Sequence, residues 1–201
     1  MAAIAMADAG TRAMTSVVRA ATLPVRWIDR ALLAHYRIFE FTDDPQCILR
    51  VNLAPSPSDI TLRDGTHVSR GEVLAELHLW SQRSMRVQSG VELRRRMYGS
   101  FGSFARFARS DPRFAALRAV LMRTSACDQF PRPLVKKLAE GWGFEIDERP
   151  RSRAERFSDF WDNVYITLLG LAYPSRGIHL RRRLERLSIW ISMRRMIELH
   201  G

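Results

Sequence analysis

The sequence predicts one α+β domain in which a small antiparallel β-meander packs against several helices. Alternating apolar residues between positions 47 and 80 predict the strands, and apolar residues at three–four spacing from about 91 to 172 predict the helices. No internal repeat or low-complexity segment divides the chain. With 201 residues, 46% hydrophobic and 26% charged, the chain can bury one core without disulfides.

The domain begins after an N-terminal segment, residues 1–22, which is expected to form a frayed helix. Asp8 and Gly10 interrupt its apolar run, and basic residues follow rather than precede it, so it does not resemble a secretory signal. No window reaches the roughly 18 apolar residues of a membrane span. We expect residues 23–201 to be a single cytoplasmic domain, whose contact with the inner membrane would be peripheral.

Helix and strand signals then alternate along the first part of the domain. Pro24 suits the first turn of a helix over 25–39. Strict alternation predicts strands over 47–53 and 72–80, with two short strands between them, 60–62 and 66–68. Asp64-Gly65 predicts a type I′ turn joining the two short strands.

The second part of the domain is predicted to be mostly helical. The expected helices cover 91–108, a segment from Asp111-Pro112 through Leu121, 134–142 and 154–172. Two further strands are expected at 144–146 and 188–191. Ser192 is placed to cap a final helix over 193–199.

The net charge is +11, from 32 basic and 21 acidic residues. Only Lys136 and Lys137 are lysine, and arginine is the better partner for bidentate ion pairs with carboxylates. The charge therefore predicts an ion-paired surface rather than a nucleic-acid-binding protein. Cys47 and Cys127 are expected to be free thiols in a reducing compartment.

The strand over 72–80 carries the candidate site. Its alternation places Val73, Ala75, Leu77 and Leu79 toward the core, and Glu76, His78 and Trp80 on the other face with Leu74. If the strand over 47–53 lies alongside, its outward residues join that face. The ligand-binding candidates are Arg50, Asn52, Glu76, His78 and Trp80.

Two interpretations of this face are open. A carboxylate raises the pKa of a neighbouring imidazole, which makes His78 a candidate base with Glu76 as its orienting partner. The alternative is a structural network, or a non-catalytic binding surface, that satisfies polar groups beneath packed helices. We favour the non-catalytic interpretation, because no other catalytic signature is present.

Metal and cofactor motifs are missing from the sequence. The five histidines are far apart, and no Cys-x-x-Cys occurs, so no metal site is predicted. The run from Gly99 to Ser103 matches neither a phosphate-binding loop nor a nucleophile elbow. We expect no cofactor.

A second candidate surface lies at the arginine-rich C-terminus. Its candidates for binding an anion, such as a lipid headgroup, are Arg181, Arg182, Arg183, Arg194 and Arg195. The alternative, which we favour, is an exposed and ion-paired element whose apolar residues face the core.

Three runs of the chain resemble the bacterial YkoP-like domain: Asp43 to Val51, Leu62 to Thr66, and Gly71 to Trp80 with its Glu-Leu-His-Leu-Trp motif. The C-terminal run from Leu187 to Ser192, which precedes a short helix, is also similar to this family. The family usually carries asparagine after the tryptophan, where this chain has Ser81.

The resemblance implies a context rather than a reaction. The family is an uncharacterised domain that occurs alone or attached to polysaccharide deacetylase-like proteins. It suggests an accessory or ligand-binding module of envelope glycan or lipid metabolism, whose partner is an envelope-biosynthesis protein or an anionic ligand. A small enzyme using His78 and Glu76, or an arginine-rich binder of membrane surfaces or RNA, is the alternative.

Overall fold

The computed structural model describes residues 27–79 apart from 29, then 81–84, 87, 89–126, 131–149 and 185–201. Short helical pieces at 156–157, 159–161 and 163–164 are described as well. Trp80, Cys127 and most of the helix expected over 154–172 lie outside the described residues.

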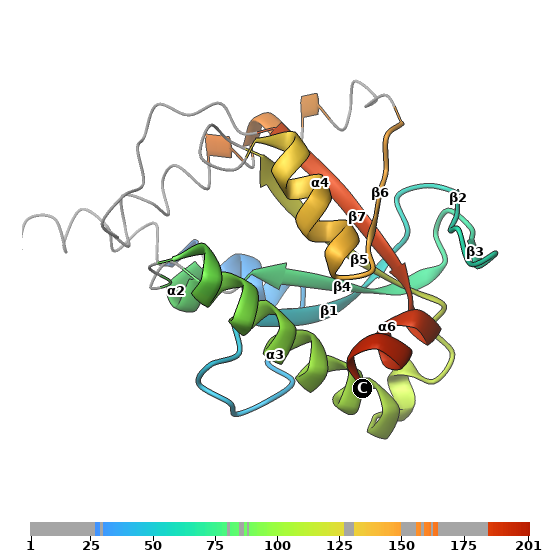
Figure 1. Ribbon diagram of the computed structural model, residues 1–201, viewed down its shortest axis with the longest axis horizontal. Helices are drawn as coiled ribbons and strands as arrows, with labels where there is room; N and C mark the ends of the chain where they lie inside the picture. Colours follow the sequence, from blue (N-terminus) through green and yellow to red (C-terminus); the bar gives the residue numbers. More distant parts are fainter. Residues whose placement is uncertain are drawn as a thin grey trace, which may run out of the picture.

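A five-stranded mixed sheet forms the centre of the molecule (Figure 1). Its strand order is β1-β4-β5-β7-β6, and β4 and β5 are parallel while the other neighbours are antiparallel. The strands are β1 (Leu49–Pro55), β4 (Val73–Leu79), β5 (Ala119–Ala126), β6 (Glu145–Ile146) and β7 (Glu185–Ser192). The α+β class is confirmed.

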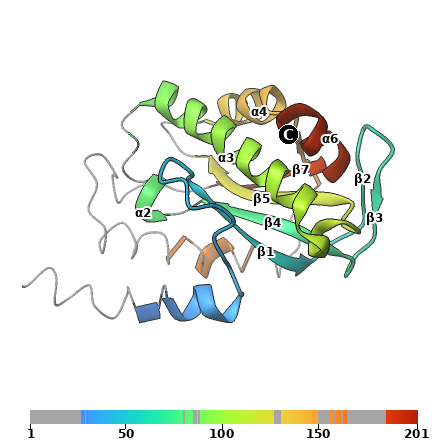
Figure 2. The same ribbon diagram turned by 90° about the horizontal axis from the view of Figure 1, so that it is seen from below.

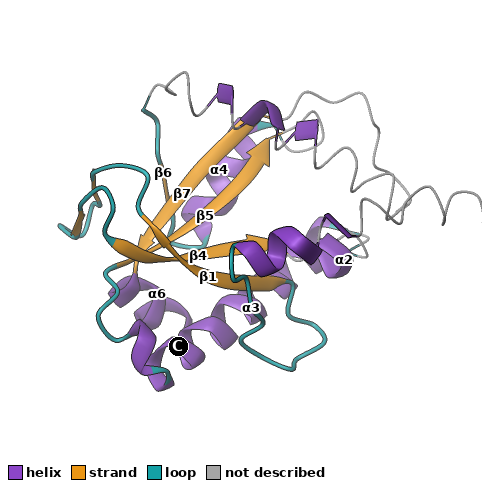
Figure 3. Ribbon diagram, turned by 180° about the vertical axis from the view of Figure 1, so that it is seen from behind, coloured by secondary structure: helices purple, strands orange, loops and turns teal. Residues whose placement is uncertain are grey.

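The predicted antiparallel meander is wrong. β2 (Ile60–Thr61) and β3 (His67–Val68) form a hairpin of their own outside the sheet, so β1 pairs directly with β4. The hairpin projects from one end of the sheet (Figure 3). Its turn is not type I′ either: Gly65 has a φ of 82°, but Asp64 is not among the positive-φ residues. Gly65 N donates to Leu62 O at 2.9 Å, which indicates a type I turn followed by a left-handed glycine.

The helix expected from Asp111-Pro112 through Leu121 is also wrong. Only the 3₁₀ turn η1 (Pro112–Phe114) is helical there, and the chain continues as β5. β5 lies between β4 and β7 and is buried on both faces from Ala119 to Met122. A continuous apolar run of this kind is typical of a central strand and cannot be told from a buried helix by its period.

One face of the sheet is covered by α3 (Gly90–Ser110), α4 (Arg132–Gly141) and α6 (Met193–His200) (Figure 2). Ser89 caps the start of α3, where its side chain accepts from Glu92 N. Ser192 caps the start of α6 by accepting from Arg195 N, and this cap was predicted. A short helix, α2 (Ser81–Ser84), follows β4. The main core lies between the sheet and α3, where Phe101 and Phe104 are fully buried.

The second face of the sheet is divided into two halves. At the hairpin end, Leu62 and Val68 of the hairpin segment pack on four sheet residues: Leu74, Ala119, Leu121 and Trp190. At the other end, the segment that contains helical residues 30–35 passes over β1 (Figure 2). The polar residues of the candidate site lie in this second half.

Candidate binding face of the sheet

The register of β1 and β4 places the predicted site residues on one face. Arg50 lies opposite His78, and Asn52 lies opposite Glu76. Directly opposed residues of an antiparallel pair project to the same side of the sheet, so these four predicted residues share one face, while the fifth, Trp80, lies outside the described residues. Arg123 of β5 reaches Glu76 from the neighbouring strand. We call these five residues the polar face: Arg50, Asn52, Glu76, His78 and Arg123.

His78 is half-buried and joined to the segment before β1 by one asparagine. Asn52 Nδ2 donates to the backbone oxygen of Tyr36 at 3.3 Å, which leaves Asn52 Oδ1 as the acceptor. His78 Nε2 lies 2.8 Å from that oxygen, so Nε2 carries the proton and donates. Nδ1 of the neutral ring then bears the lone pair.

The surroundings of His78 favour its neutral form. Burial, and then the positive charges of Arg123 and Arg186, lower the pKa of His78 to about 4. The expectation that Glu76 raises this pKa is therefore wrong. Two arginines on the next strands of the sheet, which the sequence reasoning did not place beside His78, dominate over the carboxylate.

Glu76 is directed to Arg123. The Glu76 residue is 6% exposed, and its Oε1 lies 3.0 Å from Arg123 Nε. The Arg123 side chain is 41% exposed, so the pair joins a buried carboxylate to a guanidinium that solvent reaches. The sequence reasoning missed Arg123 because it assigned the segment after Pro112 to a helix.

Arg50 belongs to the edge of the polar face. Its Nη2 donates to Glu40 Oε1 at 3.1 Å, and Arg83 Nη2 lies 4.0 Å from Glu40 Oε2. Arg83 Nη1 also donates to the backbone oxygens of Asp44 and Cys47. Arg50 is thus tied to the segment preceding β1, and Arg123 is the more exposed arginine of the face.

The C-terminal arginines are only partly within the described residues. Arg181, Arg182 and Arg183 lie outside them, as does Trp80. Arg194 is exposed and pairs with Asp64 at 3.5 Å and with Glu198 at 3.9 Å. Arg195 is exposed, and its backbone N–H donates to the Ser192 cap. For Arg194 the structure agrees with the ion-paired alternative.

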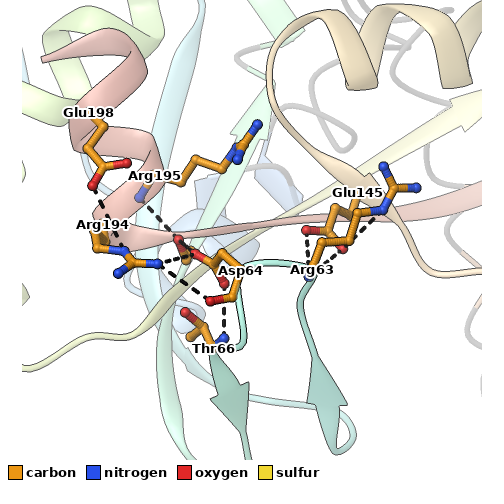
Figure 4. A network of polar contacts seen from close by, with 8 residues as sticks. Arg63, Asp64, Thr66, Glu145, Arg194, Arg195 and Glu198 are labelled. Atoms are coloured by element: carbon orange, nitrogen blue, oxygen red, sulfur yellow. Dashed lines mark hydrogen bonds and ion pairs between the residues drawn. The ribbon is translucent and has the colours of Figure 1, made fainter.

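The contacts of Arg194 are part of a latch that fixes the hairpin to the rest of the molecule (Figure 4). Asp64 Oδ2 accepts from Ser192 Oγ at 2.5 Å, and Asp64 Oδ1 accepts from Thr66 N at 2.9 Å. On the other side of the turn, Arg63 N donates to Glu145 Oε1 at 2.9 Å. We call this set of contacts the hairpin latch.

Asp64 is ionised at neutral pH in this latch. Burial opposes ionisation, but hydrogen bonds from Ser192 and Thr66 and the charge of Arg194 outweigh it and lower the pKa of Asp64 to about 2. The Ser192 hydroxyl both accepts from α6 and donates to Asp64. The latch therefore connects the hairpin turn to the start of α6.

No group of three or more metal-ligating side chains occurs within the described part of the chain. None of the described helices is long and apolar enough to cross a membrane.

The chain was also compared with known proteins. No protein-family model, no curated protein and no solved structure matches it. The resemblance to the YkoP-like domain stays a prediction that rests on the motifs themselves.

Proposed function

We propose that the protein is a non-enzymatic accessory module that binds an anionic ligand of envelope glycan or lipid metabolism on the polar face, in the cytoplasm. The motif resemblance to the YkoP-like domain supports the ligand class. The observation that carries the proposal is the Glu76–Arg123 pair, in which a buried carboxylate holds an exposed guanidinium beside a neutral imidazole.

An arginine held in this way is prepared for an oxyanion. Its planar donors match carboxylate and phosphate oxygens, and a side chain that is already fixed loses less conformational entropy on binding. Arg186 adds positive charge, since it contributes to the lowered pKa of His78. The neutral His78 ring adds a hydrogen-bonding group to the face and carries no charge of its own.

The enzyme alternative has less support. His78 Nε2 is engaged by Asn52, and Glu76 pairs with Arg123, so the two residues do not act on one another as a base and its orienting partner. A base whose conjugate acid has a pKa of about 4 is also weak near neutrality.

Titration of ¹⁵N-labelled protein with two anionic probes tests the proposal: N-acetylglucosamine 1-phosphate for the glycan source and glycerol 3-phosphate for the lipid headgroup. We expect saturable shifts at residues of β4 and β5 with one of the probes. Arg123→Gln should weaken that binding about tenfold, which corresponds to about 1.4 kcal/mol.

Arg70→Gln is the matched control, because Arg70 is exposed and its hydrogen bond to Asp59 Oδ1 is made by its backbone N–H. It should bind like the unmodified protein. Absence of saturable shifts with both probes, or equal binding by Arg123→Gln, would contradict the proposal.

A further inference from the structure

A hollow of about 430 Å³ lies between α3 and the loop that precedes β1. It is lined by Asp44, Gln46, Arg95, Arg96 and Gly99. The loop is fixed to the helix, because Ile48 N donates to Ser100 Oγ at 3.0 Å; Figures 1 and 2 show the two segments side by side. This volume is within the range of small-molecule sites, roughly 300–1,000 Å³.

Arg96 lines the hollow with a guanidinium group that is fixed in place. Its Nη2 pairs with Glu92 Oε1 at 2.6 Å, which fixes the side chain along the helix. Its Nε is buried and has no hydrogen-bond partner among the described residues. Because this atom is closed to solvent, a ligand in the hollow would meet the accessible part of the Arg96 guanidinium instead.

Arg95 adds a second available cation. It is exposed and forms no hydrogen bond or ion pair with the described part of the chain. Two guanidinium groups that line one hollow, one of them held by Glu92, suit an oxyanion such as a phosphate or a carboxylate.

The opposite wall has a different chemistry. Asp44 Oδ1 accepts from Gln46 N at 2.8 Å, and this contact fixes the carboxylate in the loop. Asp44 does not pair with Arg95 or Arg96, although all three line the hollow. Carboxylate and amide groups are suitable acceptors and donors for hydroxyl groups.

Gly99 keeps the space open. A Cβ placed on it would meet nothing within 4 Å, so the position carries no packing contact. Glycine in a helix interior is unfavourable by about 0.8–1.0 kcal/mol relative to alanine, so local helix stability does not explain it here.

We propose that this hollow binds a small hydroxylated oxyanion, either a sugar phosphate or an acidic sugar. Arg95 and the guanidinium of Arg96 bind the oxyanion, and Asp44 and Gln46 bind the hydroxyl groups. The hollow lies beside α3, on the side of the sheet opposite the polar face, so this site is additional to the one proposed above.

Calorimetric titration of the full chain tests the proposal with four probes: glucose 6-phosphate, glucuronate, glucose and inorganic phosphate. We expect one or both of the charged sugars to bind, and to bind about tenfold or more tightly than glucose and inorganic phosphate. The better charged sugar identifies the oxyanion as phosphate or carboxylate.

Two variants test the residues. Arg95→Gln should weaken binding of the charged sugar about tenfold. Gly99→Leu should fill the hollow and weaken binding at least as much while the melting temperature does not fall, because leucine is a better helix former than glycine and the position is open. Arg106→Gln, an exposed arginine of the same helix, should bind normally.

Three results would overturn the proposal. The first is no saturable binding of either charged sugar at about 10 mM, a concentration that reveals even weak sites. The second is unchanged binding by both Arg95→Gln and Gly99→Leu. The third is binding of glucose or inorganic phosphate as tight as that of the charged sugars.

Discussion

The two halves of the sheet's second face are covered in different ways, one by apolar packing and the other by polar side chains. At the hairpin end, Leu74 and Trp190 are completely buried beneath Leu62 and Val68. At the polar face, the same strand β4 carries Glu76 and His78, and the neighbouring Arg123 is partly exposed. A half closed by apolar packing serves stability, whereas a half that keeps an exposed cation on a buried carboxylate is suited to a ligand.

The two halves also differ in the ionisation state that they favour, a charged Asp64 at the hairpin end and a neutral His78 at the polar face. Asp64 in the hairpin latch is surrounded by donors and a cation, which hold its pKa at about 2. His78 is partly buried beside two arginines, which hold its pKa at about 4. Acid therefore weakens both halves, but in different pH ranges.

The largest effect is expected at the hairpin end. Trp190→Ala should lower the free energy of unfolding by about 3–5 kcal/mol, because it removes a fully buried aromatic side chain. Urea denaturation measures the loss. Trp27→Ala is the control, since Trp27 is 75% exposed, and it should change stability by less than about 0.5 kcal/mol. Equal losses would show that the hairpin end is not a packed core.

The next effect tests the buried acid of the polar face. Glu76→Ala should lower the free energy of unfolding by about 2 kcal/mol, because it leaves Arg123 without its buried carboxylate while solvent still reaches the guanidinium. Glu140→Ala, at an exposed helical position, should be nearly neutral. A loss no larger than that of the control would mean that Glu76 contributes nothing to the arrangement of Arg123.

The pH dependence of stability tests His78. Since its pKa is lowered from 6.5 to about 4 in the folded protein, the unfolded chain gains a proton first as the pH falls. Its stabilising contribution is thus complete above pH 6.5 and is lost down to about pH 4, amounting to about 2 kcal/mol after allowance for partial exposure.

His78→Gln retains a donor for Asn52 but cannot titrate. Chemical denaturation of both proteins between pH 7 and pH 4 measures the difference, and the variant should lose less stability over this range. Parallel pH profiles for the two proteins would contradict the assignment of His78 as a neutral, partly buried group.

The smallest effect is expected at the hairpin latch. Asp64→Asn should lower the free energy of unfolding by about 1 kcal/mol at neutral pH, because it loses charged hydrogen bonds near the surface. The contribution of Asp64 is present above pH 4 and is lost as the pH falls toward 2, so the variant should differ least from the unmodified protein at about pH 2. A difference that persists there would indicate lost packing instead of lost charge.

The sequence predicted the parts of this account that depend on local pattern. The alternation in β1 and β4 placed Arg50, Asn52, Glu76 and His78 on one face, and the register confirms it. The Ser192 cap and the helix after it were predicted as well. In each case the predictive pattern lies within a single strand or a single helix turn.

The failures depend on long-range neighbours. β5 is apolar on both faces because it lies between β4 and β7, and its residues have no period that separates a strand from a helix. Because β5 was not predicted as a strand, Arg123 was not placed beside Glu76 and His78. Arg123 is the ion-pair partner of Glu76 and one cause of the low pKa of His78. Only the pairing of distant segments reveals such contacts.

The pKa of His78, followed by its ring ¹H and ¹⁵N chemical shifts in an NMR titration, is the most direct test of the polar face. We expect a midpoint near pH 4, with the proton of the neutral ring on Nε2. A midpoint at or above 6.5, the pKa of a free histidine, would mean that an acid partner holds the imidazolium, and the acid–base interpretation would replace the binding one.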